Sequence, residues 1–135
     1  MNVIITKSQY QKIVFDLLET LYGPDLTYKN GPDTIPIFSN DGEEIFRVYT
    51  KGGKAKGCKK DLLVTADTTE EIKKYVPSAA FRKKLFSKTV ISFVNQKTDL
   101  NIDCIEFWSS NIMRGLEYEK RYNFNVKKNK KAKRQ

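Results

Sequence analysis

The stretch TKSQYQKIVFDLLETLYGP, residues 6–24, gives the strongest indication of how this chain folds. Thr6 and Gln9 have the spacing of a capping box, and the Gly-Pro pair at 23–24 is typical of a helix stop. The spacing therefore predicts a helix over about Lys7–Tyr22 whose apolar stripe must be buried against a sheet or a partner. The stripe follows the helical repeat through Tyr10, Ile13, Val14, Leu17, Leu18 and Leu21.

Short runs with β-strand composition, separated by turn residues, follow this helix. Asn-Gly and Asp-Gly pairs in the turns at 30–33 and 40–42 tolerate positive φ and are strong reverse-turn signals. We therefore expect a meander of three or four antiparallel strands. The runs are Leu26–Lys29, Ile35–Ser39, Glu44–Thr50 and Asp61–Thr65, and NVII at 2–5 is a further short candidate strand.

The second half of the chain mixes helical and strand patterns. Asp67 or Thr68 is the expected cap of a short helix that ends before Pro77, and Ser78 begins another. The β-branched residues 88–96 fit either a continued helix or a strand, and Ile102–Trp108 resembles a buried strand. The alternation of apolar and polar residues near the C-terminus predicts a late strand. One face of this strand is formed by Leu116, Tyr118, Tyr122, Phe124 and Val126. The fold class is therefore α+β.

Composition excludes several kinds of chemistry. The 135 residues include no histidine, the commonest general base and metal ligand, so we expect no enzyme activity, no cofactor and no metal site. Cys58 and Cys104 are expected to be free thiols, Cys104 in the core. No apolar run is long enough to span a bilayer, and no signal peptide is recognisable, so we expect a soluble protein made in a cytoplasm.

Positive charge is concentrated at the C-terminus. Residues 127–135, KKNKKAKRQ, hold six of the 25 basic residues and no acid. The remaining 19 basic and 16 acidic residues leave the rest of the chain near +3, so most of the +9 net charge belongs to this tail. We predict one domain over 1–126 and a basic tail over 127–135, which either is merely solubilising or contacts nucleic acid or an acidic neighbouring subunit.

The stretch KGGKAKGCKK, residues 51–60, has the glycine spacing of a phosphate-binding loop but lacks the rest of that motif. Cys58 and Lys59 replace the required Lys and hydroxyl residue, and a strand follows where a helix should begin. We interpret it as a flexible, basic hairpin loop that makes contacts. The predicted contact residues for nucleic acid or a partner are Lys51, Lys54, Lys56, Lys59, Lys60, Lys127, Lys128, Lys130, Lys131, Lys133 and Arg134.

Three other groups of residues give weaker indications of a functional site, and each has an ordinary structural explanation. A carboxylate-metal nuclease would draw on Asp33, Glu43, Glu44 and Lys51, but these acids lie beside turns, where exposed acids are common. The cluster of Arg82, Lys83, Lys84 and Lys88 fans around its helix, which favours simple solvation. Tyr122 and Phe124 stand among basic residues and are suited to stacking on bases, although their shared apolar face favours a core or an interface.

The N-terminal sequence resembles a short motif found in small proteins of tailed bacteriophages, including crAss-like phages. Its form is a short strand followed by I-T-[ED]-x-Q-[LYF]-x-[KR]-[IL], matched here by Ile5, Thr6, Gln9, Tyr10, Lys12 and Ile13. Lys7 departs from the usual acid at its position. The stretches at 37–51 and 61–76 also resemble such proteins, some of which are virion components.

The resemblance implies a non-enzymatic virion structural protein, either capsid-associated or a head–tail connector or tail component, acting by oligomeric packing. Its expected partners are other virion proteins, further copies of itself and, through the tail, packaged DNA, with no membrane and no small-molecule substrate. We expect it in the virion, and in the host cytoplasm during assembly. The alternative is a small basic nucleic-acid-binding or host-takeover phage protein in the infected cytoplasm.

Overall fold

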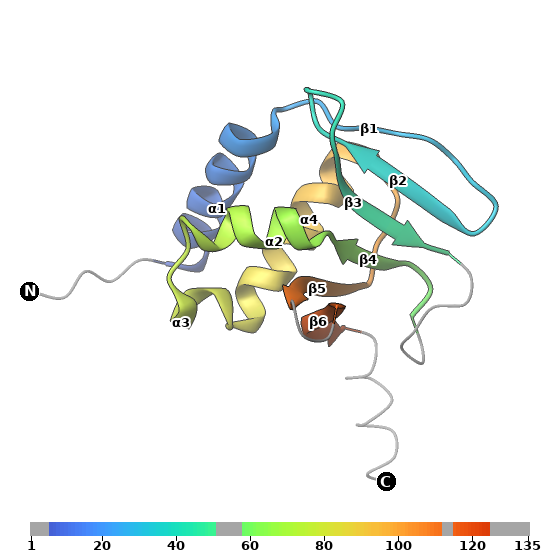
Figure 1. The fold of residues 1–135 in the computed structure, drawn as a ribbon. Helices are drawn as coiled ribbons and strands as arrows, with labels where there is room; N and C mark the ends of the chain where they lie inside the picture. Colours follow the sequence, from blue (N-terminus) through green and yellow to red (C-terminus); the bar gives the residue numbers. More distant parts are fainter. Residues whose placement is uncertain (1–5, 51–57, 112–114, 125–135) are drawn as a thin grey trace, which may run out of the picture.

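The computed structural model describes residues 6–50, 58–111 and 115–124, and within them the fold is α+β. These residues form a six-stranded mixed sheet with the sequential order β1-β2-β3-β4-β5-β6 (Figure 1). Phe46, Val64 and Phe107 lie in one row across the sheet. Side chains from three helices contact this row, so those helices share one face of the sheet.

Helix α1, Lys7–Tyr22, begins and ends where the sequence predicts. The capping box is present, because Thr6 Oγ1 accepts a hydrogen bond from Gln9 N at 3.1 Å and Gln9 Oε1 accepts one from Thr6 N at 2.8 Å. The buried face is rotated slightly from the predicted stripe. Ile13 stays 57% exposed, whereas Tyr22 is buried at the helix end.

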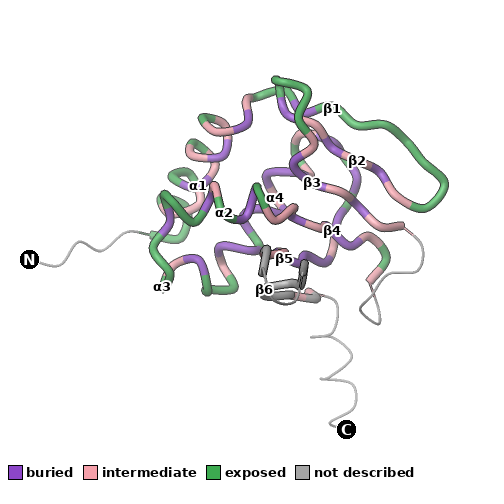
Figure 2. Tube along the Cα trace, viewed as in Figure 1, coloured by how far each residue is buried: buried purple, intermediate pink, exposed green. Residues whose placement is uncertain are grey.

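The predicted meander is confirmed as antiparallel. The predicted strand at 2–5 lies outside the described residues. Burial alternates along β2 and, from Phe46 onward, along β3, and this period of two leaves the opposite face of these strands partly exposed (Figure 2). Ile45, next to Phe46, is also buried. The four strands are β1 (Thr27–Tyr28), β2 (Thr34–Phe38), β3 (Glu44–Tyr49) and β4 (Asp61–Val64).

Three helices connect β4 to β5, and they resolve the ambiguous region. Residues 88–96 are helical, within α4. The predicted cap of α2 is wrong, because Thr65 and not Asp67 or Thr68 is the N-cap residue. Its backbone is extended and its hydroxyl accepts from Thr68 N, which is the geometry a cap needs. The helices are α2 (Ala66–Lys73), α3 (Ser78–Phe81) and α4 (Lys84–Thr98).

Helices α1 and α4 lie side by side and run in the same direction. Phe15 packs edge-on against Phe93 with ring centroids 5.7 Å apart. Near the carboxyl ends of both helices, Lys97 Nζ lies 2.7 Å from Glu19 Oε2. The amino ends of the two helices therefore lie at the same end of the molecule.

The last two strands confirm two predictions, the buried strand expected at Ile102–Trp108 and the late strand, and their pairing adds a feature that was not predicted. The late strand is β6, Gly115–Asn123, antiparallel to β5, Cys104–Asn111. Strand β5, however, pairs in parallel with β4, so the sheet is mixed. A parallel pair needs a long crossover, and the three helices supply it.

The prediction of free thiols is wrong, because Cys58 and Cys104 form a disulfide with Cα atoms 5.9 Å apart. The parallel pairing of β4 with β5 places Asp61 beside Cys104, and Cys58 lies three residues earlier. The two cysteines are 46 residues apart in sequence, so no local pattern indicates the pairing. Cys104 is fully buried, as expected for a core position.

The core is one cluster of apolar side chains between the helices and the sheet. Its largest fully buried members are phenylalanines from β3, α3, α4 and β5, and those of α3, α4 and β5 meet with their rings edge-on or tilted. Within the described part of the chain, no helix combines the length and the hydropathy needed to cross a bilayer.

Candidate functional site

An acidic cleft of about 340 Å³ lies where the carboxyl end of α1 meets the β2–β3 turn and the amino end of α2. Its walls come from three segments that are distant in sequence, so only the fold brings them together. We use the name acidic cleft for the hollow lined by the carboxylates of Asp41, Glu43, Glu44, Asp67 and Glu71 and by Leu21, Tyr22, Ser39, Ile45 and Thr68.

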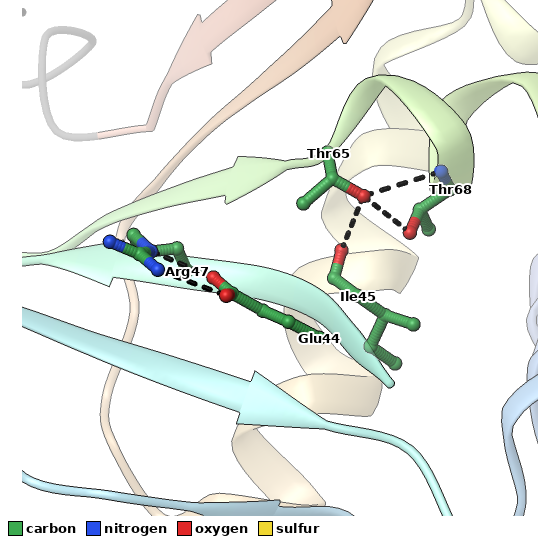
Figure 3. Close-up of polar contacts among 5 residues, drawn as sticks. All are labelled: Glu44, Ile45, Arg47, Thr65 and Thr68. Atoms are coloured by element: carbon green, nitrogen blue, oxygen red, sulfur yellow. Dashed lines mark hydrogen bonds and ion pairs between the residues drawn. The ribbon is translucent and has the colours of Figure 1, made fainter. Parts of the chain in front are cut away.

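Thr65 fixes the position of α2 against β3 at the edge of this cleft (Figure 3). Its hydroxyl lies 3.3 Å from the carbonyl oxygen of Ile45 and 2.7 Å from the hydroxyl of Thr68. Its backbone N–H also donates to Ile45 O at 3.3 Å. The start of β3 and the amino end of α2, which both bear carboxylates of the cleft, are therefore joined directly.

The cleft carboxylates differ in whether a cation neutralises them. Glu44 accepts two hydrogen bonds from the Arg47 guanidinium, at 2.7 and 2.9 Å, and Glu71 lies 3.6 Å from Lys74 Nζ. The carboxylates of Asp41, Glu43 and Asp67, which belong to exposed residues, have no such partner among the described residues. The cleft therefore carries unneutralised negative charge.

Two residues with hydroxyl groups, Tyr22 and Ser39, also line the cleft. Burial and the negative charges of Glu71 and Glu43 raise the pKa of the Tyr22 hydroxyl above its usual value, so this hydroxyl stays protonated. Ser39 also lines the cleft, and within the described structure its hydroxyl forms no hydrogen bond, so it is open to solvent or to a group that enters the cleft.

The carboxylates of the acidic cleft are not grouped as metal ligands in the described structure. No group of three or more Asp, Glu, Cys or His residues there is arranged to hold a metal ion. The nuclease constellation considered from sequence is also not assembled, because Asp33 is absent from the cleft that contains Glu43 and Glu44. Its fourth member, Lys51, lies outside the described residues.

A basic surface lies at the opposite end of α1. Two adjoining hollows of about 320 and 250 Å³ share Lys7 and Leu85, and both are rimmed by lysines. We call this the lysine surface and define it by Lys7, Lys83, Lys84 and Lys88, which are all exposed. Among the described residues, none of these four forms an ion pair.

The lysine surface also coincides with the positive ends of two helix dipoles. Helices α1 and α4 both begin there, and neither carries an acidic residue in its first turn. The N-cap residue of α4, Lys83, provides no side-chain cap. Acidic residues usually occupy such positions, because helix N-termini attract negative charge. Lysines here therefore reinforce the positive potential.

Of the contact residues predicted from sequence, the structure describes Lys59 and Lys60. Their backbone N–H groups donate to the Asp103 carboxylate, at 3.2 Å to Oδ2 and 3.0 Å to Oδ1, so this end of the 51–60 loop is anchored to Asp103. The other predicted contacts lie outside the described residues: Lys51, Lys54, Lys56, Lys127, Lys128, Lys130, Lys131, Lys133 and Arg134.

Tyr122 and Phe124 occupy the position that their apolar pattern favoured. Both are half-buried against the core, and their rings stack with centroids 6.0 Å apart. The Tyr122 hydroxyl donates to Arg82 O at 2.8 Å, and Lys84 Nζ lies 5.5 Å from the centre of the Phe124 ring. Neither ring stands free as a platform for bases, although Phe124 borders the lysine surface.

Reasoning from sequence missed the acidic cleft entirely, and it left Lys7 out of the basic cluster. Each cleft acid has a sufficient local explanation, such as a turn or the first turn of a helix. The parallel alignment of α1 with α4, which brings Lys7 to Lys84 and Lys88, is likewise a tertiary feature. The cluster at 82–88 was recognised, but it was assigned to solvation.

Comparison with known proteins adds no family assignment. No protein-family model matches the chain, and neither curated proteins nor solved structures show significant similarity to it.

Proposed function

We propose that this chain is a structural protein of a tailed-bacteriophage particle, capsid-associated or part of the head–tail connector or tail, and that it acts by packing against other subunits. The observation that carries the proposal is the pair of unneutralised, oppositely charged surfaces at the two ends of α1. Charges left without partners among the described residues favour contacts with charged macromolecules.

The disulfide supports a virion location over a purely cytoplasmic one. Disulfides persist on virions and cell surfaces, whereas reducing systems keep most cytosolic thiols reduced. The Cys58–Cys104 bond therefore fits a protein that is made in the host cytoplasm and then leaves it in a particle. The resemblance of the N-terminus to phage proteins supports the same location, and the sequence provides no histidine for catalysis.

Mass spectrometry of purified particles tests this proposal. The expected result is a defined number of copies per particle that survives a density gradient and a high-salt wash. Absence from particles of a phage that encodes the chain, or copy numbers that vary between preparations, would contradict it.

The lysine surface favours a second candidate function, a small basic nucleic-acid-binding protein of the infected cytoplasm. Four exposed lysines at two helix N-termini also suit phosphate groups, and the basic tail adds to their charge. This candidate predicts a monomer whose affinity for duplex DNA falls steeply with salt. A chain that self-associates and binds DNA weakly at physiological salt favours the structural role.

A further inference from the structure

We propose that the acidic cleft of one copy receives the lysine surface of a second copy, so that subunits join head to tail along the direction of α1. This inference rests on the proposed structural function and names the contact through which subunits pack. The two surfaces were defined above by Asp41, Glu43, Glu44, Asp67 and Glu71 and by Lys7, Lys83, Lys84 and Lys88.

Charge complementarity between the two surfaces is the first support. Asp41, Glu43 and Asp67 have no cation partner within the described chain, and the lysine surface has no anion partner. The cleft of one copy can therefore supply anion partners for the lysine surface of another copy, and that lysine surface can supply cation partners for the cleft. Juxtaposed in a complex, they would exchange water for charge-assisted hydrogen bonds.

The geometry of α1 makes this contact intermolecular. Leu21 and Tyr22, its last residues, line the cleft, and Lys7, its first, lines the lysine surface. A helix of 16 residues is about 24 Å long at a rise of 1.5 Å per residue. The two surfaces of one copy therefore cannot meet, and a contact between two different patches generates a ring or an open chain of subunits.

The helix dipoles strengthen the attraction. Because α1 and α4 run in parallel, their positive ends add to the charge of the lysines. The Ser39 hydroxyl, which lines the cleft and has no hydrogen bond in the described structure, provides an acceptor and a donor for an incoming ammonium group or backbone group. The cleft thus offers polar recognition in addition to a general negative field.

Two neutral variants and their mixture test the proposal. The cleft variant, Asp41→Asn with Glu43→Gln, keeps the turn chemistry, because Asn-Gly is as good a turn as Asp-Gly. The surface variant is Lys84→Gln with Lys88→Gln. Sedimentation velocity of the full chain should show concentration-dependent self-association of the wild type, and each variant alone should raise the dissociation constant at least about tenfold.

The mixture gives the discriminating result. The cleft variant keeps its lysine surface and the surface variant keeps its cleft, so an equimolar mixture should form one intact contact and stop at a heterodimer. Wild-type protein under the same conditions should continue to larger species. Association of the mixture that is no stronger than that of either variant alone would overturn the head-to-tail contact.

Matched controls separate the contact from overall charge. Asp25→Asn with Glu70→Gln removes two exposed carboxylates outside the cleft, and Lys12→Gln with Lys29→Gln removes two exposed lysines outside the lysine surface. Both should self-associate as the wild type does. Controls that weaken association as much as the test variants, or a wild type that stays monomeric at all concentrations, would refute the inference.

A tail-mediated contact is distinguished by a further variant. Removing residues 127–135 should leave self-association within about threefold of the wild type, because the contact lies between described surfaces. Loss of association in this variant alone would place the tail in the cleft and overturn the proposal. If particles contain the chain and the variants still associate normally, the contact is wrong while the structural function stands.

Discussion

At the scale of single residues, Thr65 shows how one hydroxyl positions the acidic cleft. It caps α2 and also bonds the Ile45 carbonyl at the start of β3, so the helix and the strand that bear the cleft carboxylates share one anchor. From sequence Asp67 or Thr68 was the expected cap, and because the local preference for Asp is as strong as that for Thr, nothing local sets Thr65 apart from them. Only the bond to β3, a tertiary contact, distinguishes them.

Replacing this residue gives a direct prediction. Thr65→Ala should lower the free energy of unfolding by about 1–2 kcal/mol, because it removes the cap of α2 and the bond to Ile45. Thr65→Ser keeps the hydroxyl and should lose less than half as much. Urea denaturation followed by circular dichroism measures both. Equal losses would mean that the methyl group, not the hydroxyl, matters.

Two glycines make a matched test of the region beside the cleft. Gly23 and Gly42 both have positive φ, +93° and +83°, so alanine is strained at either position, at a cost of about 1 kcal/mol. A Cβ at position 23 would also collide with the Asn40 side chain, whereas a Cβ at position 42 meets nothing within 4 Å. Gly23→Ala should therefore destabilise the protein more than Gly42→Ala in thermal unfolding. The reverse order would show that Asn40 moves aside freely.

At the scale of helices and strands, elements marked by local sequence signals were predicted correctly, whereas pairings between distant segments could not be read from the sequence. Helix α1 was predictable because its cap, its apolar period and its Gly-Pro stop all lie within 19 residues, and the antiparallel strands were marked by their turns. The parallel pairing of β4 with β5 joins segments about 40 residues apart through three helices, and no turn residue marks it. The disulfide and the anchored end of the 51–60 loop both depend on that pairing.

The disulfide gives the prediction at this scale. It closes a loop of 46 residues, which in the chain-entropy model restricts the unfolded state by about 4 kcal/mol. Cys58→Ser should lower the free energy of unfolding by about 2–4 kcal/mol in oxidising buffer. With excess dithiothreitol the variant and the wild type should unfold at similar denaturant concentrations. A wild type unaffected by dithiothreitol would contradict this account.

At the scale of the whole molecule, charged residues are concentrated in the acidic cleft, in the lysine surface and in the C-terminal tail. Outside the basic tail the net charge is only about +3, yet among the described residues carboxylates without a cation partner gather at one end of α1 and lysines without an anion partner at the other. A net charge cannot reveal such an arrangement, because it depends on which segments the fold brings together. The α+β class and the charged clusters near 82–88 were accessible from sequence, but the cleft and its separation from the lysines were not.

This arrangement predicts that self-association depends on salt. Exposed charges are screened over about 8 Å at 0.15 M ionic strength and about 3 Å at 1 M. Association measured by sedimentation should therefore weaken markedly between low and high sodium chloride, and more for the wild type than for the Lys84→Gln, Lys88→Gln variant. Association that strengthens with salt would indicate an apolar interface in place of the charged one.

Carbodiimide cross-linking of purified particles tests the central claim most directly. The reagent joins a carboxylate to a lysine only where the two touch, and the cleft and the lysine surface of one copy are separated by the length of α1. We predict cross-linked peptides that pair Glu43 or Asp67 with Lys84 or Lys88, which can arise only between copies. Particles that contain the chain but yield carboxylate–lysine links exclusively at other sites would contradict the head-to-tail packing.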